Sequence, residues 1–431
     1  MSKRIAIAAA LAVAASGSGV AAADEVSELK AAVQALQQRI DQLESKAKET
    51  EDTNDRQTDL IAKQRASATL PSGFTWKGDL RYRNETIEQE YARDRNRDRI
   101  RVRTGFTAKV NDTITTEVGL ATSEGGDPRS SNQTLTGENT RKAIELDVAN
   151  VTWQPHADWK ITAGKMKYPW VRPGQSVLFD GDVNPEGLAV NFGHGMFFAS
   201  AFYNLLEERG GSFTGPTADS NLAGGQVGLR GTLGSASKWT LGAGYFDFNA
   251  VKGRNPFYNG SSNGNTTATT AALCSVGVSP CLRYDFTQTE LFGEFATALG
   301  RLPLSAHADW FKNDDADNGL DTAYSVGVLL GKAGDPGTWE LGYVYQHIEK
   351  DALYAQYIDS DFGGGNTDAE GSIIKGAYAF AKNWTLNLTY FLNKTNIDVA
   401  TTLSGVPGLA SATQIRDRDY KRLQVDLNWK Y

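Results

Sequence analysis

Apolar and polar side chains alternate at every second position in the last twelve residues of the chain. A period of two is typical of a β-strand with one apolar and one polar face. Because free chain ends tend to fray, an aromatic row at the terminus indicates a strand held in the closing seam of an outer-membrane β-barrel. The apolar face carries Leu423, Val425, Leu427, Trp429 and Tyr431, and the polar face carries Arg422, Gln424, Asp426, Asn428 and Lys430.

The same alternation recurs along most of the chain after residue 73. It is found at residues 74–83, 99–107, 239–245, 339–345 and 384–390. Several of these segments begin or end with an aromatic residue of the apolar face, as the interfacial girdle of a membrane barrel requires. We therefore predict an all-β fold, a transmembrane antiparallel β-barrel.

Seven short links alternate with eight longer polar segments, which predicts about sixteen strands. An even strand number puts both ends of the barrel on the side of the short turns, the periplasmic side. Val177–Phe179 fit either the third long segment or a strand. The short links are Asn111–Asp112, Pro155–Asp158, Gly193–Gly195, Gly234–Ser237, Gly300–Pro303, Ala333–Gly337 and Ala381–Asn383. The longer segments are residues 88–96, 122–141, 169–186, 206–222, 249–283, 313–320, 349–369 and 397–418.

Residues 1–23 have the pattern of a secretory signal peptide. Lys3 and Arg4 precede an apolar run at residues 5–15, and three alanines at 21–23 form the cleavage site. That run is too short to cross a bilayer as a helix. We expect an exported chain with three parts, the signal peptide (1–23), a periplasmic coiled coil (24–70) and the outer-membrane barrel (71–431).

The coiled coil is predicted from apolar residues spaced alternately three and four apart. Such a seam is typical of helices that pack against each other, since its apolar stripe is too narrow to stabilise a lone helix in water. The alternative is a solvated spacer helix. The seam consists of Val26, Leu29, Val33, Leu36, Ile40 and Leu43.

Charge and cysteine content narrow the choice of partners. Loss of Lys3 and Arg4 with the signal leaves a net charge of −9, against the −7 of the whole chain, and this argues against nucleic-acid binding. Cys274 and Cys281, close together in a loop-like segment of an exported chain, predict a disulfide. Two cysteines with no nearby histidine make a poor metal site, and we predict no metal and no cofactor.

Basic residues gather on the polar face of three strands that are neighbours in a closed barrel. In a barrel of this size that face lines a water-filled lumen, so these residues are candidates for attracting anions. The alternative is that they form ion pairs across the strands with Asp79, Glu85, Asp98, Glu117 and Asp426. The candidate pore-lining residues are Arg81, Arg83, Arg99, Arg101, Arg103, Lys165, Lys167 and Arg422.

An enzyme is the less favoured interpretation. Of the four histidines, His156 and His194 fall in predicted short turns, while His307 shares the polar face of one strand with Asp309. A bare His-x-Asp is a weak indication of acid–base chemistry, and the chain has neither a Gly-x-Ser-x-Gly nor a His-Glu-x-x-His motif. We expect a histidine that lines the lumen and no catalytic residues.

The chain resembles the Gram-negative family named "putative porin". The resemblance covers the mature chain and implies a sixteen-stranded outer-membrane barrel with an N-terminal coiled coil that acts as a channel, without implying a particular solute. Phosphate-selective porins are a related possibility, although the chain has no regular Arg/Lys ladder. The matching segments are Trp76–Arg83, Arg97–Arg103, Ala163–Met166 and Asp180–Gly187.

In trimeric porins the third loop commonly folds into the lumen as a constriction. Here that loop contains Asp180, Asp182 and Glu186, which we expect to face Arg101 and Arg103. A calcium site or a rigid turn is the alternative, but the spacing lacks the rest of an EF-hand loop.

Together these patterns predict a pore for passive diffusion of small hydrophilic solutes or ions, with an anion bias if the arginines face water. We expect a homotrimer, formed through the barrel wall and the coiled coil, within outer-membrane lipid. The alternative function is surface recognition or adhesion through the long loops.

Overall fold

The computed structural model describes residues 30–46, 48, 73–210, 218–234, 236–258, 260–404, 409 and 413–431. The chain divides into two compact units, Met1–Pro71 and Ser72–Tyr431. In the first unit, residues 30–46 and 48 are helical. The four seam residues within this helix, from Val33 to Leu43, are 39% to 62% exposed. Within the described residues, no helix combines the length and the apolar character needed to cross a membrane.

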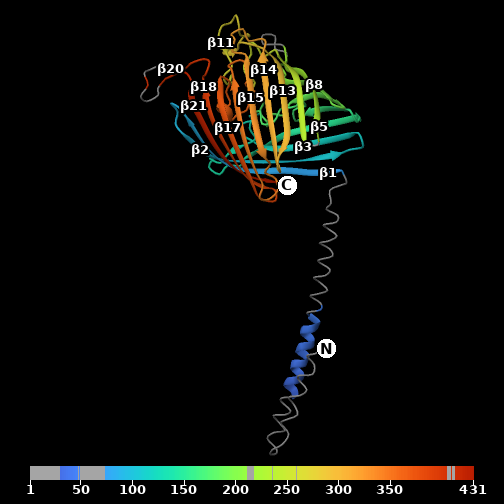
Figure 1. The fold of residues 1–431 in the computed structure, drawn as a ribbon. Coiled ribbons are helices and arrows are strands. Elements are labelled where there is room, and N and C mark those ends of the chain that lie inside the picture. The colour runs from blue at the N-terminus through green and yellow to red at the C-terminus, as the bar shows by residue number, and fades with distance from the viewer. Residues whose placement is uncertain are drawn as a thin grey trace, which may run out of the picture. The chain divides into compact units, whose positions relative to one another are not determined.

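Sixteen of the described strands in the second unit close into one antiparallel barrel, because each strand pairs with the next and the last pairs with the first. Figure 1 shows the first, blue strands beside the last, red ones. The strands are β1 (Phe74–Gln89), β2 (Arg95–Lys109), β3 (Ile114–Ser123), β5 (Ala143–His156), β6 (Trp159–Lys165), β7 (Glu186–His194), β8 (Phe197–Glu207), β9 (Ser220–Leu233), β10 (Ser237–Asn249), β13 (Phe286–Leu299), β14 (Leu302–Asn313), β15 (Thr322–Gly331), β16 (Trp339–Ile348), β17 (Ala369–Ala381), β18 (Trp384–Thr395) and β21 (Arg418–Lys430).

Short elements decorate the loops between these strands. β4 (Gln133–Thr134) pairs with β2, and two small hairpins form from β11 (Thr267–Ala268) with β12 (Cys281–Leu282) and from β19 (Thr401–Leu403) with β20 (Thr413–Ile415). A 3₁₀ turn, η1 (Phe362–Gly364), precedes β17.

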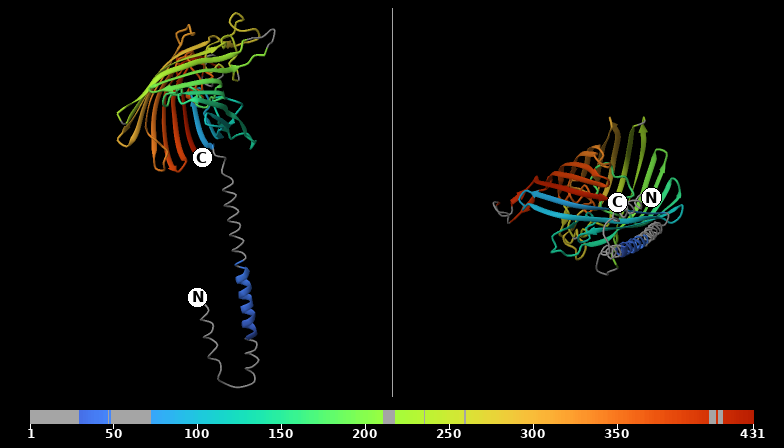
Figure 2. Two further views of the ribbon diagram at one scale, coloured as in Figure 1. Left: turned by 90° about the vertical axis from the view of Figure 1, so that its right-hand side faces the viewer. Right: turned by 90° about the horizontal axis from the view of Figure 1, so that it is seen from below.

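The connections alternate between short and long, so the predicted antiparallel barrel of about sixteen strands is confirmed. Figure 2 shows the long connections gathered at one end of the strands. Two of them recur below: loop 3 (residues 166–185, between β6 and β7) and loop 7 (residues 349–368, between β16 and β17). Val177–Phe179, which fitted either a strand or a loop, lie in loop 3.

The two faces of each strand differ in exposure as the period of two requires. On β21, Leu423 is 37% exposed and points outward, whereas Arg422 is 3% exposed and points into the barrel. Outward aromatics such as Trp76 and Trp339 are also exposed. In the isolated chain this apolar outer surface has no cover; in a bilayer, lipid covers it.

Loops 3 and 7 pack together inside the barrel and form its apolar core. Phe179 of loop 3 contacts Phe246 of β10, Phe311 of β14 and Tyr357 of loop 7, with ring centroids 5.3 to 6.4 Å apart. Residues 352–358 of loop 7 are almost fully buried in the same cluster. The two loops therefore fill one side of the lumen against β8 to β18.

Candidate pore constriction

A row of arginines lines the inner face where the barrel closes. The strand registers bring these side chains level, since Arg81 lies opposite Arg101, and Arg83 lies opposite both Arg99 and Asp426. All of them share the polar face of β1, β2 or β21. We call this row, which consists of Arg81, Arg83, Arg99, Arg101, Arg103 and Arg422, the arginine wall.

Carboxylates of the same strands neutralise much of the arginine wall. Asp79 accepts hydrogen bonds from Arg101 at 2.7 Å and from Arg103 at 2.8 Å. Asp426 receives two bonds from Arg83, at 2.7 and 2.8 Å, in the bidentate geometry that suits a guanidinium. This pairing favours the interpretation in which the arginines brace the wall.

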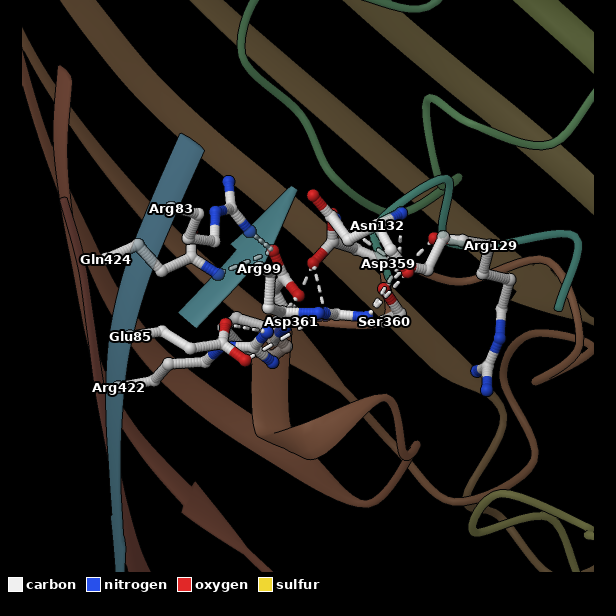
Figure 3. Close-up of polar contacts among 12 residues, drawn as sticks. Arg83, Glu85, Arg99, Arg129, Asn132, Asp359, Ser360, Asp361, Arg422 and Gln424 are labelled. Carbon is white, nitrogen blue, oxygen red and sulfur yellow. Dashed lines mark hydrogen bonds and ion pairs between the residues drawn. The ribbon is translucent and has the colours of Figure 1, made fainter. Parts of the chain in front are cut away.

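Loop 7 supplies a further carboxylate to the wall. Glu85 of β1 pairs with Arg422 at 2.5 Å and also with Arg97. Asp361, at the tip of loop 7, lies 2.7 Å from Arg422 and 3.1 Å from Arg83 (Figure 3). Burial raises the pKa of the Asp361 carboxyl, but Arg422 and Arg83 outweigh burial and hold this pKa well below its usual range. Loop 7 is therefore fastened to the closing seam by a charged carboxylate.

Loop 3 reaches the arginine wall through Asp182. Its carboxylate lies 3.4 Å from Arg103 and accepts a hydrogen bond from the Ser131 hydroxyl at 2.8 Å. Burial raises the pKa of Asp182, whereas Arg101, Arg103 and Arg81 lower it, and the net result is a pKa of about 2. Asp182 is ionised at neutral pH and contacts the arginine wall directly.

Asp180 faces loop 7 and not the arginines. Its carboxylate accepts the Ser360 amide at 2.9 Å, and its own amide donates to the Tyr357 carbonyl at 2.8 Å. Burial, with the neighbouring Asp359 and Asp182, raises the pKa of Asp180 well above its usual value. Asp180 joins the two inserted loops to each other.

The remaining predicted lining residues lie at the rim of loop 3. Lys165 ends β6 and pairs with Glu186, the first residue of β7, at 2.8 Å. Lys167 lies 3.6 Å from Asp147 of β5. These contacts put Glu186 beside a lysine and not opposite Arg101 or Arg103.

Two cavities with charged residues in their lining border the contact between Asp182 and Arg103. One, of about 330 Å³, is lined by Asp182 together with residues of loops 2 and 5 (residues 124–142 and 250–285). The other, of about 290 Å³, includes Arg103 and charged residues of β1, β3 and β21. Both cavities reach Asp147. Their charged residues are Asp79, Glu117, Asp127, Glu145, Asp147, Asp182 and Glu186, against Lys77, Arg103, Lys165, Lys167 and Lys430.

The His307 and Asp309 side chains hold loop 3. The Gln175 amide donates to His307 Nδ1 at 3.3 Å, and the Ser176 hydroxyl donates to Asp309 at 2.9 Å. Both residues are buried beneath the loop, away from an exposed cleft.

Cys274 and Cys281 form a disulfide in loop 5. Among the described residues, no group of three potential metal ligands comes together.

Loop 7 is the element that sequence patterns missed. The sequence pattern predicts one long polar segment at residues 349–369, yet the run Ala352–Ile358 within it contains two tyrosines, Leu353 and Ile358. Such an apolar run inside a polar loop is the signal that indicates burial. Asp359 and Asp361 follow this run, and no sequence pattern indicated that Asp361 pairs with Arg83 and Arg422.

The family comparison agrees with this architecture. A model of the family described as "Putative porin" matches residues 43–281 and 283–405. The chain belongs to this porin family. It is therefore an outer-membrane barrel that forms a channel for passive diffusion. No curated protein sequence matches the chain.

Several solved outer-membrane barrels are similar in structure to this porin. OmpT of Vibrio cholerae is 15% identical over 84% of this chain and 99% of its own, with a TM-score of 0.48. An anion-selective porin from Comamonas acidovorans is 14% identical over 83% and 99%, with a TM-score of 0.46. Pseudomonas putida OprB is 11% identical over 88% and 97%, with a TM-score of 0.49.

Proposed function

We propose that small hydrophilic solutes pass along the arginine wall, through the two cavities and past the contact between Asp182 and Arg103. The observation that carries this route is that both cavities reach Asp147 and are lined by charged residues. The opposite side of the lumen is filled by the apolar packing of loops 3 and 7. Water-soluble molecules avoid such a dry core, so the polar side is the passage.

We also propose that the channel discriminates weakly between anions and cations. The arginine wall contacts carboxylates, and the two cavities together present seven acidic and five basic side chains. Opposite charges close together largely cancel at the distance of a permeating ion. This balance supports the bracing role of the arginines over a strong anion bias.

The protein carries out no covalent chemistry in this proposal. The acid–base candidate that the sequence offered, His307 with Asp309, is occupied in anchoring loop 3.

The assembly that we propose is a homotrimer with a periplasmic coiled coil. The exposed seam from Val33 to Leu43 supports helix association, because an apolar stripe is stable in water only when a partner covers it. An even number of strands puts the start of β1 on the side of the short turns. Residues 1–29, which include the predicted signal peptide and the seam residues Val26 and Leu29, and residues 49–72 lie outside the described residues.

Single-channel current in a planar bilayer under a salt gradient tests the channel. We expect discrete steps and a reversal potential close to zero. A large reversal potential of the anion-selective sign would overturn the balanced lining and restore the predicted anion bias. A folded, heat-modifiable barrel that gives no steps at all would overturn the channel itself and favour surface recognition.

A further inference from the structure

Two buried carboxyl groups lie near each other beneath loop 3. Glu290 of β13 is 1% exposed and Asp309 of β14 is 4% exposed. They lie on the inner face, diagonally across the β13–β14 pair, because Asp309 is opposite Phe292 and Glu290 is opposite Phe311. Within the described residues, neither carboxyl has an ion-pair partner within 4 Å.

This pair is connected to both ends of one segment of loop 3. Gln226 donates to Glu290 at 2.5 Å, and the same amide group exchanges hydrogen bonds with the backbone of Val171 at 2.8 and 3.0 Å. At the other end, the Ser176 hydroxyl donates to Asp309 at 2.9 Å. The segment from Val171 to Ser176 is thus held through the carboxyl pair.

Among the described residues, the charged and titratable groups around the pair form no ion pair with it. Loop 3 contributes Arg172, whose guanidinium lies over the Tyr168 ring, 5.2 Å from the ring centroid. β13 contributes Glu294, which accepts the Gly174 amide, and β14 contributes His307. β17 contributes Lys375, which donates to Gln175.

Two ionised carboxylates that are close together and out of water repel strongly, so such a pair retains one proton between them. We propose that Glu290 and Asp309 form a proton-binding site that anchors loop 3. With the proton bound, one carboxyl donates to the other and the segment 171–176 stays in place. Loss of the proton leaves two negative charges in a buried site. Water must then enter the site to solvate them, and segment 171–176 is released. This inference rests on the proposed channel.

The test is single-channel recording of the intact porin between acidic and alkaline pH. We expect a stable conductance at low pH and, as the pH rises, frequent transitions between levels. The Glu290→Gln variant replaces one acid with a neutral amide of the same shape, and its channel should keep the low-pH behaviour at every pH. The matched control is Glu294→Gln, which touches the same loop segment but is not part of the pair; it should keep the pH-dependent transitions.

Hydrogen exchange of the peptide that covers loop 3 supplies a second readout on the wild-type protein. Exchange, corrected for its intrinsic pH dependence, should rise at high pH in loop 3. Wild-type channels whose steps do not change with pH, or a Glu290→Gln variant with the wild-type pH profile, would overturn the proton site and leave the channel intact. An absence of steps at every pH would instead contradict the channel.

Discussion

The two sides of the lumen hold the inserted loops by opposite physical means. On the side of β1, β2 and β21, the tips of loops 3 and 7 meet arginines through Asp182 and Asp361. On the side of β8 to β18, the same loops bury aromatic rings against the wall, with Phe179 at the centre. One set of contacts is charged and borders the two cavities; the other is apolar and dry.

This difference gives the two sides different roles, one in the stability of the constriction and the other in its selectivity for solutes. Apolar burial is non-directional and excludes water, so it fixes the loops without defining a path for solutes. Ion pairs lose part of their Coulomb energy to desolvation, but they put fixed charges where solutes pass. The dry side therefore supplies most of the stability of the constriction, and the charged side determines what goes through it.

The largest expected effect comes from the dry side. Phe179→Ala removes the ring that Phe246, Phe311 and Tyr357 surround, and such a truncation costs about 3–5 kcal/mol. Denaturant unfolding in detergent micelles measures this loss. Leu341→Ala, which truncates an outward residue that is 53% exposed, is the control and should cost much less. Equal losses of stability in the two variants would show that loop 3 contributes nothing to the apolar core.

A smaller effect is expected from the charged side. Asp361→Asn leaves Arg83 and Arg422 short of one carboxylate, which should cost about 2–3 kcal/mol, less than for a fully buried pair because Asp361 is 20% exposed. Its reversal potential should also move toward anion preference. Asp112→Asn, in the exposed turn after β2, is the control and should change neither quantity. An unchanged reversal potential would show that the charge of Asp361 does not act on ions passing through the pore.

The smallest effect concerns acid pH. Since the pKa of Asp182 is lowered from 3.8 to about 2, its ionised form stabilises the fold above pH 4, and this contribution is lost as the pH falls toward 2. Conductance that depends on the contact with Arg103 should therefore stay constant from pH 7 to about 4 and change only below. Asp182→Asn should remove that acid transition. An acid transition that persists in the Asp182→Asn variant would contradict the assignment to Asp182.

The barrel itself was predictable because its information is local. Alternation at every second position identified strands such as Tyr420–Tyr431, and turn residues between them gave the number of strands. Lipid on the outside and water on the inside impose this period on each strand separately. The residues of the arginine wall were predictable as well, because residues such as Arg81 and Arg101 lie on the polar face of adjacent strands.

The arrangement inside the lumen depends on contacts between residues far apart in the chain, and such contacts leave no periodic pattern in the sequence. Asp180, expected to face the arginines, turns instead to Ser360, which is 180 residues away along the chain. Loop 7 enters the barrel because its residues 352–358 find an apolar partner in loop 3, and neither loop has a periodic pattern. Local patterns were enough to predict a closed porin barrel with a charged seam. Which loops fill the barrel, and which carboxylate meets each arginine, depend on the shapes of surfaces that exist only after the barrel has closed, so the folded chain was needed to find them.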